Sequence, residues 1–494
     1  MPWRAPTRPT KTRFFSRHRD AADMISTRLW PAFILIALPA LAGCQMRNSP
    51  ADTPAGQGMT GQSLTGQAMT GTPSPTAQPA TATTLRAPTA RLSTAVAGTQ
   101  FGRMVAQAVR SHPDVEAAGA NISIAQADLE SSRGALRPAV SIGASAQSRV
   151  IGDRDRTNNQ ATPYLQVSQL IYDGGASASR KAAATANVQQ STNARLVTAA
   201  NTALDAVDAY LNVISARKIL ALTQDNLDAH QDMADLIEER RSAGAGSQSD
   251  VLTVRSRLAD AETLVIDAQS QLERTEARFV QMFGTSPGAL ETPPVAPALP
   301  ADTAAAVATS PRISALNAQL AASRSQLRLA EVSRRPQVEL DGTAQRADNG
   351  GKDITFGLNV EYAFDTRGQS SSAIHRARAE VTRLEAQKAA LERDIRRSMD
   401  YVKSEAAAGV QRLRSSRAAV EANRANVAAA RDEFSIGRRN LLDVLEAQRD
   451  YVQAQNTLIT SERTQIYTGY DALALTGDIV EIFQADFSNM TPPS

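Results

Sequence analysis

The clearest alternation of apolar and polar positions lies between residues 353 and 364. Apolar side chains occupy every second position there, at Ile354, Phe356, Leu358, Val360, Tyr362 and Phe364. Unbroken alternation predicts a β-strand with one apolar face, and this length suits a tilted strand that crosses a membrane. Three more alternating stretches, at about 139–149, 162–172 and 337–347, predict three partner strands.

Long helices account for most of the remaining pattern. Two stretches without proline, about 176–241 and 371–434, predict helices on the order of 100 Å long. After each, a short turn leads into a helix with apolar residues at every seventh position. These are Val251, Leu258, Val265, Leu272 and Phe279 in the first, and Leu445, Val452, Ile459, Ile466 and Leu473 in the second. Sevenfold spacing is typical of helices that pack with a coiled-coil twist.

The chain contains two copies of one unit. The segment 111–138 returns as 309–336 with its prolines in register, and SAGAGSQSDVL at 242–252 returns as SIGRRNLLDVL at 435–445. We therefore divide the chain into a first helix-strand-strand-helix-helix repeat (99–290), a Pro-rich linker (291–304), a second repeat (305–477) and a C-terminal tail (478–494).

The strands require more than one chain. Four strands of about ten residues cannot close a barrel, and an open sheet edge in lipid leaves backbone groups without hydrogen bonds. Three copies would give twelve strands. The expected fold is a mixed α and β membrane protein, a trimeric 12-stranded transmembrane β-barrel with four strands per chain, continued by a long α-helical barrel of coiled-coil hairpins.

The N-terminal region has the pattern of a bacterial lipoprotein. PAFILIALPALAG at 31–43 is an apolar run that ends in LAGC, which predicts a signal peptide over 1–43 and an acylated Cys44 as the mature N-terminus. Translation from Met24 would give a signal of ordinary length. The residue after the cysteine is Gln45. The absence of aspartate at this position resembles lipoproteins that are sorted to the outer membrane. The repetitive segment 44–98 cannot bury a core and reads as a tether. The alternative is an apolar stretch with a chance cysteine.

Charge and candidate chemistry argue against an enzyme. The formal net charge is only +3, and the excess of basic residues lies largely in the first 30 positions, so we expect no nucleic-acid partner. The four histidines and the single cysteine have no metal-ligand spacing, and neither a phosphate loop nor a G-x-S-x-G elbow occurs. We expect no catalysis, metal or cofactor.

The doubled unit over about 100–478 resembles the TolC family of bacterial outer-membrane efflux and secretion ducts. The likeness is carried by LIYDGG after the second strand and by GRRNLLDVLEAQRDYVQAQNTLI in the last helix. The resemblance implies a homotrimer with its β-barrel in outer-membrane lipid and its helical barrel in the periplasm. It also implies docking to a periplasmic adaptor tied to an inner-membrane transporter. The second copy departs from the motif, reading AFDTRGQSS where the first has IYDGGASAS.

The same resemblance assigns roles to residues near the two turns. Adaptor-docking tips fall on Ser242, Ala243, Gly244, Ser435, Ile436 and Gly437. The closed entrance would be held by Ser249 and Asp250 against Phe434 and Arg439, with one link missing because phenylalanine has no hydroxyl. An acidic entrance ring falls on Asp443 and Glu446.

Helix capping is the alternative explanation for two of these acids. Ser247 precedes Asp250 by three positions, and Asn440 precedes Asp443 by three, which is ordinary chemistry at a helix start. Capping does not explain Glu446, one turn further into the helix.

Two classes of transport use the same scaffold, so both remain open for this chain. LIYDGG resembles the secretion-type members, which favours type I protein secretion with an ABC-type transporter. Tripartite efflux of small molecules, with an RND-type transporter possible, is the alternative. A lipid-anchored periplasmic adaptor without a membrane barrel is a further alternative, and the alternation at 354–364 argues against it.

Overall fold

The structure is a computed structural model that describes residues 95–150, 157–296, 302–346 and 351–485. The predicted signal peptide, Cys44 and most of the tether lie outside these residues. All described elements belong to one compact unit, Ala82–Ser494.

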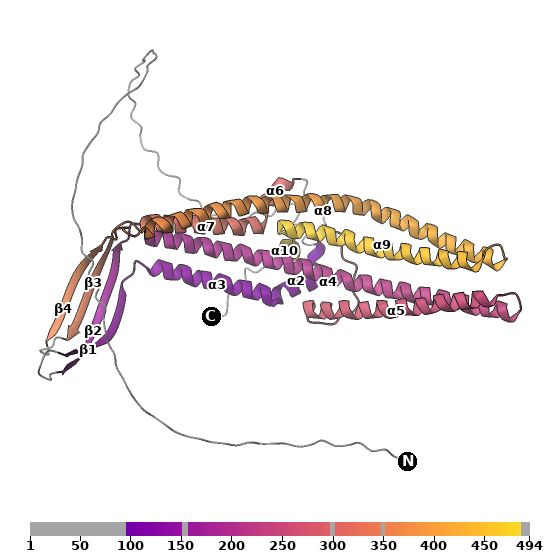
Figure 1. Ribbon diagram of the computed structural model, residues 1–494, viewed down its shortest axis with the longest axis horizontal. Helices are drawn as coiled ribbons and strands as arrows, with labels where there is room; N and C mark the ends of the chain where they lie inside the picture. The colour runs from indigo at the N-terminus through magenta and orange to yellow at the C-terminus, as the bar shows by residue number, and fades with distance from the viewer. Residues whose placement is uncertain (1–94, 151–156, 297–301, 347–350, 486–494) are drawn as a thin grey trace, which may run out of the picture. The chain divides into compact units, whose positions relative to one another are not determined.

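Both repeats are built from the same elements in the same order (Figure 1). The first contains α2 (Gln100–Ser111), α3 (Pro113–Gly134), β1 (Ala139–Val150), β2 (Thr157–Tyr172), α4 (Ala176–Ser242) and α5 (Gln248–Phe283). The second contains α6 (Thr303–Thr309), α7 (Pro311–Val332), β3 (Gln337–Arg346), β4 (Lys352–Glu361), α8 (Gln369–Ser435) and α9 (Leu441–Thr476), with α10 (Asp478–Ile482) after it. The equivalent helices match in length: 22 residues in α3 and α7, 67 in α4 and α8, and 36 in α5 and α9.

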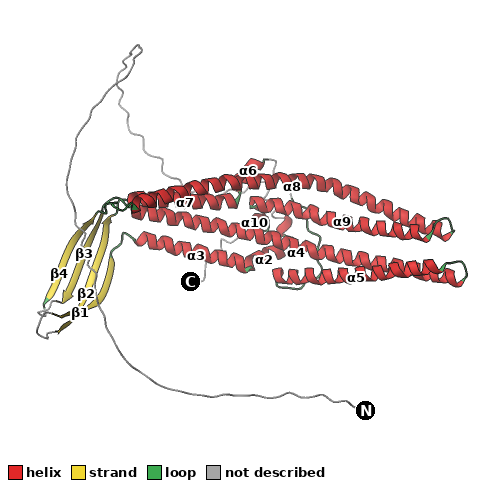
Figure 2. Cartoon of the chain, in the orientation of Figure 1, coloured by secondary structure: helices red, strands yellow, loops and turns green. Residues whose placement is uncertain are grey.

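The strands form one antiparallel sheet in the order β1-β2-β3-β4 (Figure 2). The register aligns apolar residues across it, since Ile142 lies opposite Leu165 and Leu340 lies opposite Leu358. The side chains of this face are exposed in the single chain, 85% for Ile142 and 81% for Phe356. An apolar sheet face left open in this way is what a lipid-facing surface requires. β1 and β4 are the two edges.

Two strand ends differ from the sequence expectation. β2 begins at Thr157, before the expected start at 162, because β1 runs to Val150 and gives those residues a partner. β4 ends at Glu361, so Tyr362 and Phe364 lie beyond the strand. Glu361 pairs with Gln337, the first residue of β3, and Pro336 before it has no N–H to extend the ladder.

An aspartate begins each long helix after the strands. Asp173 accepts hydrogen bonds from the backbone N–H groups of Gly175 and Ser177. Asp365 does the same for Ser370 and Ser371. Asp365 lies four positions before the start of α8, and Asp173 lies three before α4. The second junction contains a single positive-φ glycine, whereas the first contains two. The departure of AFDTRGQSS from IYDGGASAS therefore keeps the residue that caps the helix.

Helix contacts arrange the elements in rows. Near the sheet the order is α3-α4-α7-α8, and toward the helix turns it is α5-α4-α9-α8. The strands lie at one end of the long helices and the α4–α5 and α8–α9 turns at the other (Figure 1). One side of the chain thus ends in β1, α3 and α5, and the other in β4 and α8. No helix within the described ranges combines the length and apolarity needed to span a bilayer.

A buried aromatic cluster joins the repeats midway along the helices. The rings of Phe101, Tyr210 and Tyr470 meet edge to face at 4.9 and 5.6 Å. The Tyr210 hydroxyl donates to the Glu291 carbonyl and the Tyr470 hydroxyl to that of Pro294. These bonds attach the start of the inter-repeat linker to the core. Burial raises the pKa of Tyr210 to about 12, so the hydroxyl stays a donor at any physiological pH.

Candidate functional site

The two hairpin tips have the same backbone geometry. In the first, the N–H of Gly244 bonds to the Arg241 carbonyl and that of Ala245 to the Arg240 carbonyl. In the second, Gly437 bonds to Phe434 and Arg438 to Glu433. This pair of hydrogen bonds defines the Schellman motif. Both glycines have a φ of +76°, which other residues adopt only with strain, and a side chain at either would project into open space.

The remaining predicted tip residues surround these glycines. Ser242 and Ser435 end α4 and α8, and their hydroxyls donate to the carbonyls of Glu239 and Asp432. Ala243 and Ile436 are the C-caps. Both are exposed, and Ile436 presents 65% of its surface, so it is an unusually apolar point on a polar tip.

Arg240 joins the two tips of one chain. Its guanidinium, at the end of α4, donates to the carbonyls of Phe434 and Ser435 at the end of α8, at 3.3 and 3.1 Å. It also lies 4.4 Å from the centre of the Phe434 ring. The Phe434 carbonyl also accepts from the Gly437 N–H, and a cation at this end of α8 complements the helix dipole. Arg240 therefore holds the first hairpin against the second.

The predicted entrance residues have local partners within the chain. Asp250 completes a capping box, accepting from the Ser247 N–H while Ser247 accepts from the Asp250 N–H. Arg439 pairs with Glu433, with Nε 2.9 Å from Oε2. Ser249 is exposed, whereas Phe434 is buried against Arg240. The link between Asp250 and Arg439 of neighbouring hairpins stays a prediction. To form it, Asp250 would give up its bond with Ser247 and Arg439 its ion pair with Glu433.

The acids Asp443 and Glu446 differ from Asp250. The side chain of the N-cap residue Asn440 accepts from the Asp443 N–H. The Asp443 carboxylate does not accept from the Asn440 N–H, so the capping box is incomplete. Neither carboxylate forms an ion pair with any residue that the structure describes. Capping thus accounts for the N–H of Asp443 and leaves both carboxylates available.

Sequence reasoning did not identify Arg240. It lies one position before Arg241, and the pair looks like ordinary basic residues in the last turn of a helix. Its partners come from the other repeat, nearly 200 positions away, so no local pattern marks it. The cross-repeat alignment of the two tips, which puts Arg240 beside the end of α8, is the signal that could have found it.

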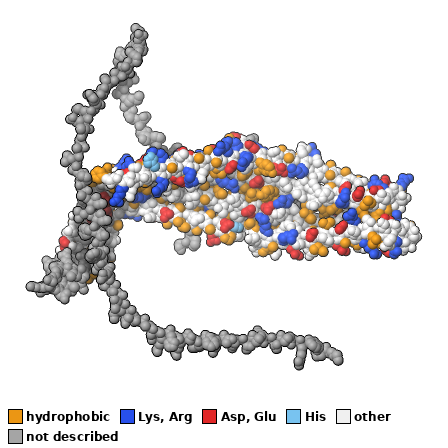
Figure 3. All heavy atoms as spheres, viewed as in Figure 1, with side chains coloured by type: hydrophobic (Ala, Val, Ile, Leu, Met, Phe, Trp, Pro, Cys, Tyr) orange, Lys and Arg blue, Asp and Glu red, His pale blue; other side chains and the backbone are white. Residues whose placement is uncertain are grey.

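A shared core backs the tips. Ile237 and Val254 from the first hairpin pack with Val427, Leu441 and Val444 from the second. Charged side chains of both signs cover the visible face of the helices (Figure 3). Many of the ion pairs between described residues are exposed, and an exposed pair contributes about 0 to 1 kcal/mol. Apolar packing, together with Arg240, therefore dominates the cohesion of the two hairpins.

We predict that acid weakens this region through His230. Burial, followed by the charges of Arg257 and Arg431, lowers the pKa of His230 below its ordinary 6.5, and Asp260 only partly opposes this. The unfolded chain then binds the proton more tightly. The stability that neutral His230 contributes is complete above pH 6.5 and is lost as the pH falls through the lowered value, at about 1.4 kcal/mol per unit of lowering.

The measurement is the thermal unfolding midpoint of the purified protein between pH 7.5 and 5. His230→Asn should flatten the acid side of the profile, and His375→Asn, which alters an exposed histidine on α8, should not. Parallel profiles for wild type and His230→Asn would contradict the assignment.

Comparison with known proteins gives the family. The model of the family described as "Outer membrane efflux protein" matches residues 104–285 and 304–474, more than half of the chain. The outer membrane efflux protein BepC of Brucella suis is 26% identical over 401 residues, covering 78% of this chain and 86% of the relative. The pyoverdine export outer membrane protein OpmQ of Pseudomonas putida is 26% identical over 406 residues, covering 75% and 84%.

A solved structure shares the fold. The outer membrane protein VceC of Vibrio cholerae superposes with a TM-score of 0.67 at 17% identity, covering 78% of this chain and 96% of that one. The predicted resemblance to the TolC family and the predicted fold, strands of a shared β-barrel continued by a helical barrel, are confirmed. Family members are channels and not enzymes. The chain belongs to the outer membrane efflux protein family, whose trimers sit in the outer membrane with a periplasmic helical part and work with an adaptor and an inner-membrane transporter.

Proposed function

We propose that the protein is a passive exit duct whose hairpin tips close the periplasmic entrance until an adaptor docks on them. The observation that carries this proposal is the tip itself. Two exposed Schellman turns are backed by a buried core and joined by one arginine, an arrangement that can bind a partner and be pulled apart.

The free sides of one chain indicate how three would join. β1, α3 and α5 end one side, and β4 and α8 end the other, in every layer of the structure. A head-to-tail contact that repeats around a threefold axis pairs β4 of one chain with β1 of the next and leaves no open edge in lipid.

For the cargo, we propose type I protein secretion with an ABC-type transporter. Support comes from the LIYDGG junction, although its aspartate also has the structural role of starting α4. The alternative is export of small molecules, which is favoured by the activity of one relative, pyoverdine export. Co-purification of the chain from its host after crosslinking at Ile436 tests the choice. An ABC-type transporter in the crosslinked complex supports secretion, and an RND-type transporter overturns it.

We predict that bulk at the tips blocks adaptor docking. A Gly244→Trp, Gly437→Trp double variant should lose export while the trimer stays intact, because the new side chains project into the space that a partner must approach. The control is Gly244→Ala, Gly437→Ala, which carries the same positive-φ strain of about 1 to 2 kcal/mol per position without the bulk. Equal loss in both double variants would attribute the effect to the strained turn, and normal export by the Trp variant would remove the tips from the docking site.

We predict that Cys44 is acylated, although it lies outside the described residues. LAGC after the apolar run motivates this prediction. Mass spectrometry of the mature N-terminus should find a lipid-modified cysteine, and an unmodified peptide spanning 40–50 as the main species would contradict it. A Cys44→Ala variant should remain in the outer membrane, because its strands still hold it there.

A further inference from the structure

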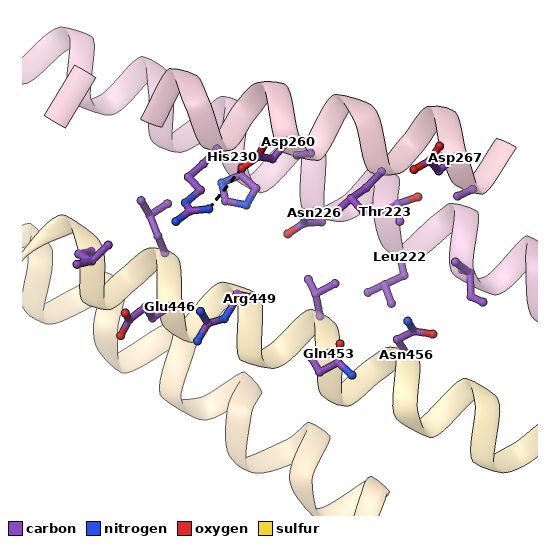
Figure 4. Close-up of a pocket in the computed structure, with 18 residues that line it drawn as sticks. Leu222, Thr223, Asn226, His230, Asp260, Asp267, Glu446, Arg449, Gln453 and Asn456 are labelled. Carbon is purple, nitrogen blue, oxygen red and sulfur yellow. Dashed lines mark hydrogen bonds and ion pairs between the residues drawn. The ribbon is translucent and has the colours of Figure 1, made fainter. Parts of the chain in front are cut away.

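A cavity of about 430 Å³ lies between α4, α5 and α9, a short distance above the tips (Figure 4). Its walls come from both hairpins, since α4 and α5 form the first and α9 belongs to the second. The volume is in the range of drug-sized binding sites. Nothing in the duct proposal uses it.

The cavity is long and narrow. Its lining on α9 runs from Leu442 to Asn456, which is about 21 Å at 1.5 Å per residue. At about 430 Å³ over that length the cavity is narrow, which suits an extended small molecule.

Its middle is apolar and its floor contains buried polar groups without full partners. Leu222, Leu445 and Val452 line the centre. Asn226 and His230 are 5% and 8% exposed and line the same space. Asn226 accepts one bond, from Gln448, and His230 makes no hydrogen bond with a described residue. Both side chains open onto the cavity, where the polar atoms of an occupant can complete their hydrogen bonds.

The two ends differ in charge. At the tip end, Arg257 of α5 and Arg431 of α8 face His230, while Asp260 of α5 and Glu446 of α9 lie nearby. Arg449 of α9 also lines the cavity and pairs with Asp450, so the charges nearly cancel. At the far end Asp267 of α5 and, on the opposite wall, Gln453 and Asn456 of α9 line the cavity. Asp267 has no ion pair with any residue in the described ranges. A cation is therefore favoured at the far end.

We propose that this cavity binds an elongated amphipathic amine, with its protonated nitrogen at Asp267 and its apolar body along Leu222, Leu445 and Val452. The polar tail of such a molecule reaches the hydrogen-bonding groups of Asn226 and His230. Because the site spans both hairpins, an occupant contacts the two parts that must separate when the entrance opens.

The test is fluorescence titration of the purified trimer in lipid nanodiscs with monodansylcadaverine, an aromatic body joined to a primary amine by a short methylene chain. Empty nanodiscs supply the background. We expect saturable binding to wild type, about fivefold weaker binding to Asp267→Asn, and a similar loss for the N-acetylated probe, as fits one partly exposed ion pair. Leu264→Trp, which puts a large ring over the cavity from a half-exposed position, should abolish binding.

Matched controls lie on the same helix outside the cavity. Glu262→Gln removes a charge and Leu252→Trp adds a ring at exposed positions of α5, and neither should change the affinity. Absence of saturable binding, or full binding to Leu264→Trp, would overturn the site. Loss in Leu264→Trp with equal binding of both probes would overturn the amine. The titration needs neither adaptor nor cargo, so either failure leaves the duct function unaffected.

Discussion

Replacing Arg240 by alanine should open the entrance. The variant loses two charge-assisted hydrogen bonds to α8 carbonyls and a contact with the Phe434 ring. A hydrogen bond to a charged group contributes about 1.5 to 3 kcal/mol, against about 0 to 1 for an exposed ion pair. Loss of about 1.5 kcal/mol shifts the ratio of open to closed states of the two hairpins in one chain by roughly tenfold. Single-channel recording in planar bilayers should show longer and larger openings.

Arg241→Ala is the matched control. Arg241 is the next residue and carries the same charge. Among the described residues, its side chain bonds only to Glu238, one turn earlier in the same helix. Arg241→Ala should conduct like wild type. The conductance of Arg240→Lys should lie between those of wild type and Arg240→Ala, since an ammonium group keeps the charge but cannot stack on a ring or donate in the planar, two-pronged geometry of a guanidinium. Equal conductance of Arg240→Ala and wild type would mean that the shared core alone holds the hairpins together.

Arg439→Ser tests the other predicted link, between Asp250 and Arg439. If Asp250 and Arg439 of neighbouring hairpins restrain the entrance, this variant should also conduct more than wild type, but less than Arg240→Ala, because Arg439 already has Glu433 as a partner. The two links join different pairs of hairpins, so the double variant should exceed both. A double variant no more open than Arg240→Ala would remove Arg439 from the gate.

Periodicity was sufficient for the architecture because each element is long and repeats its pattern. The heptad positions Val251 and Phe279 are buried, only 4% and 0% exposed, and the face of Ile354 to Val360 lies on one side of β4 as expected. Strand ends were less predictable, since they depend on partner strands. Tyr362 and Phe364 keep the alternation but have no residue opposite them, so they leave the ladder and pack on each other at 4.7 Å.

Local sequence patterns also predicted the helix caps. They did not predict contacts between residues of different repeats. Ser247 and Asp250 form the complete box that their spacing predicts, whereas the same spacing at Asn440 and Asp443 gives only half of one. Arg240 and the cavity at His230 depend on which face of one helix meets another. That geometry follows from packing of the whole chain and leaves no local signal in the sequence.

The free carboxylates of Asp443 and Glu446 lead to the second large effect, block by a multivalent cation. The residues are three apart and share a helix face, so we expect a trimer to bring about six carboxylates to one narrow opening. Two charges about 8 Å apart at an effective dielectric of about 40 repel by roughly 1 kcal/mol, a cost that a bound cation reverses. Asn440 caps α9 with its own side chain, so Asp443→Asn leaves the cap in place.

Hexamminecobalt(III) added to the periplasmic side should block wild type at low concentration, as charged rings bind cations in channels. The Asp443→Asn, Glu446→Gln variant should need roughly a hundredfold more, since losing about 3 kcal/mol of attraction corresponds to that factor. Asp432→Asn, Glu239→Gln removes two exposed acids from the tips and should block like wild type. If both double variants block alike, the net charge of the tips explains the effect. If wild type and the ring variant block alike, the acids serve only the start of α9, where a negative charge contributes about 0.3 to 1 kcal/mol through the helix dipole.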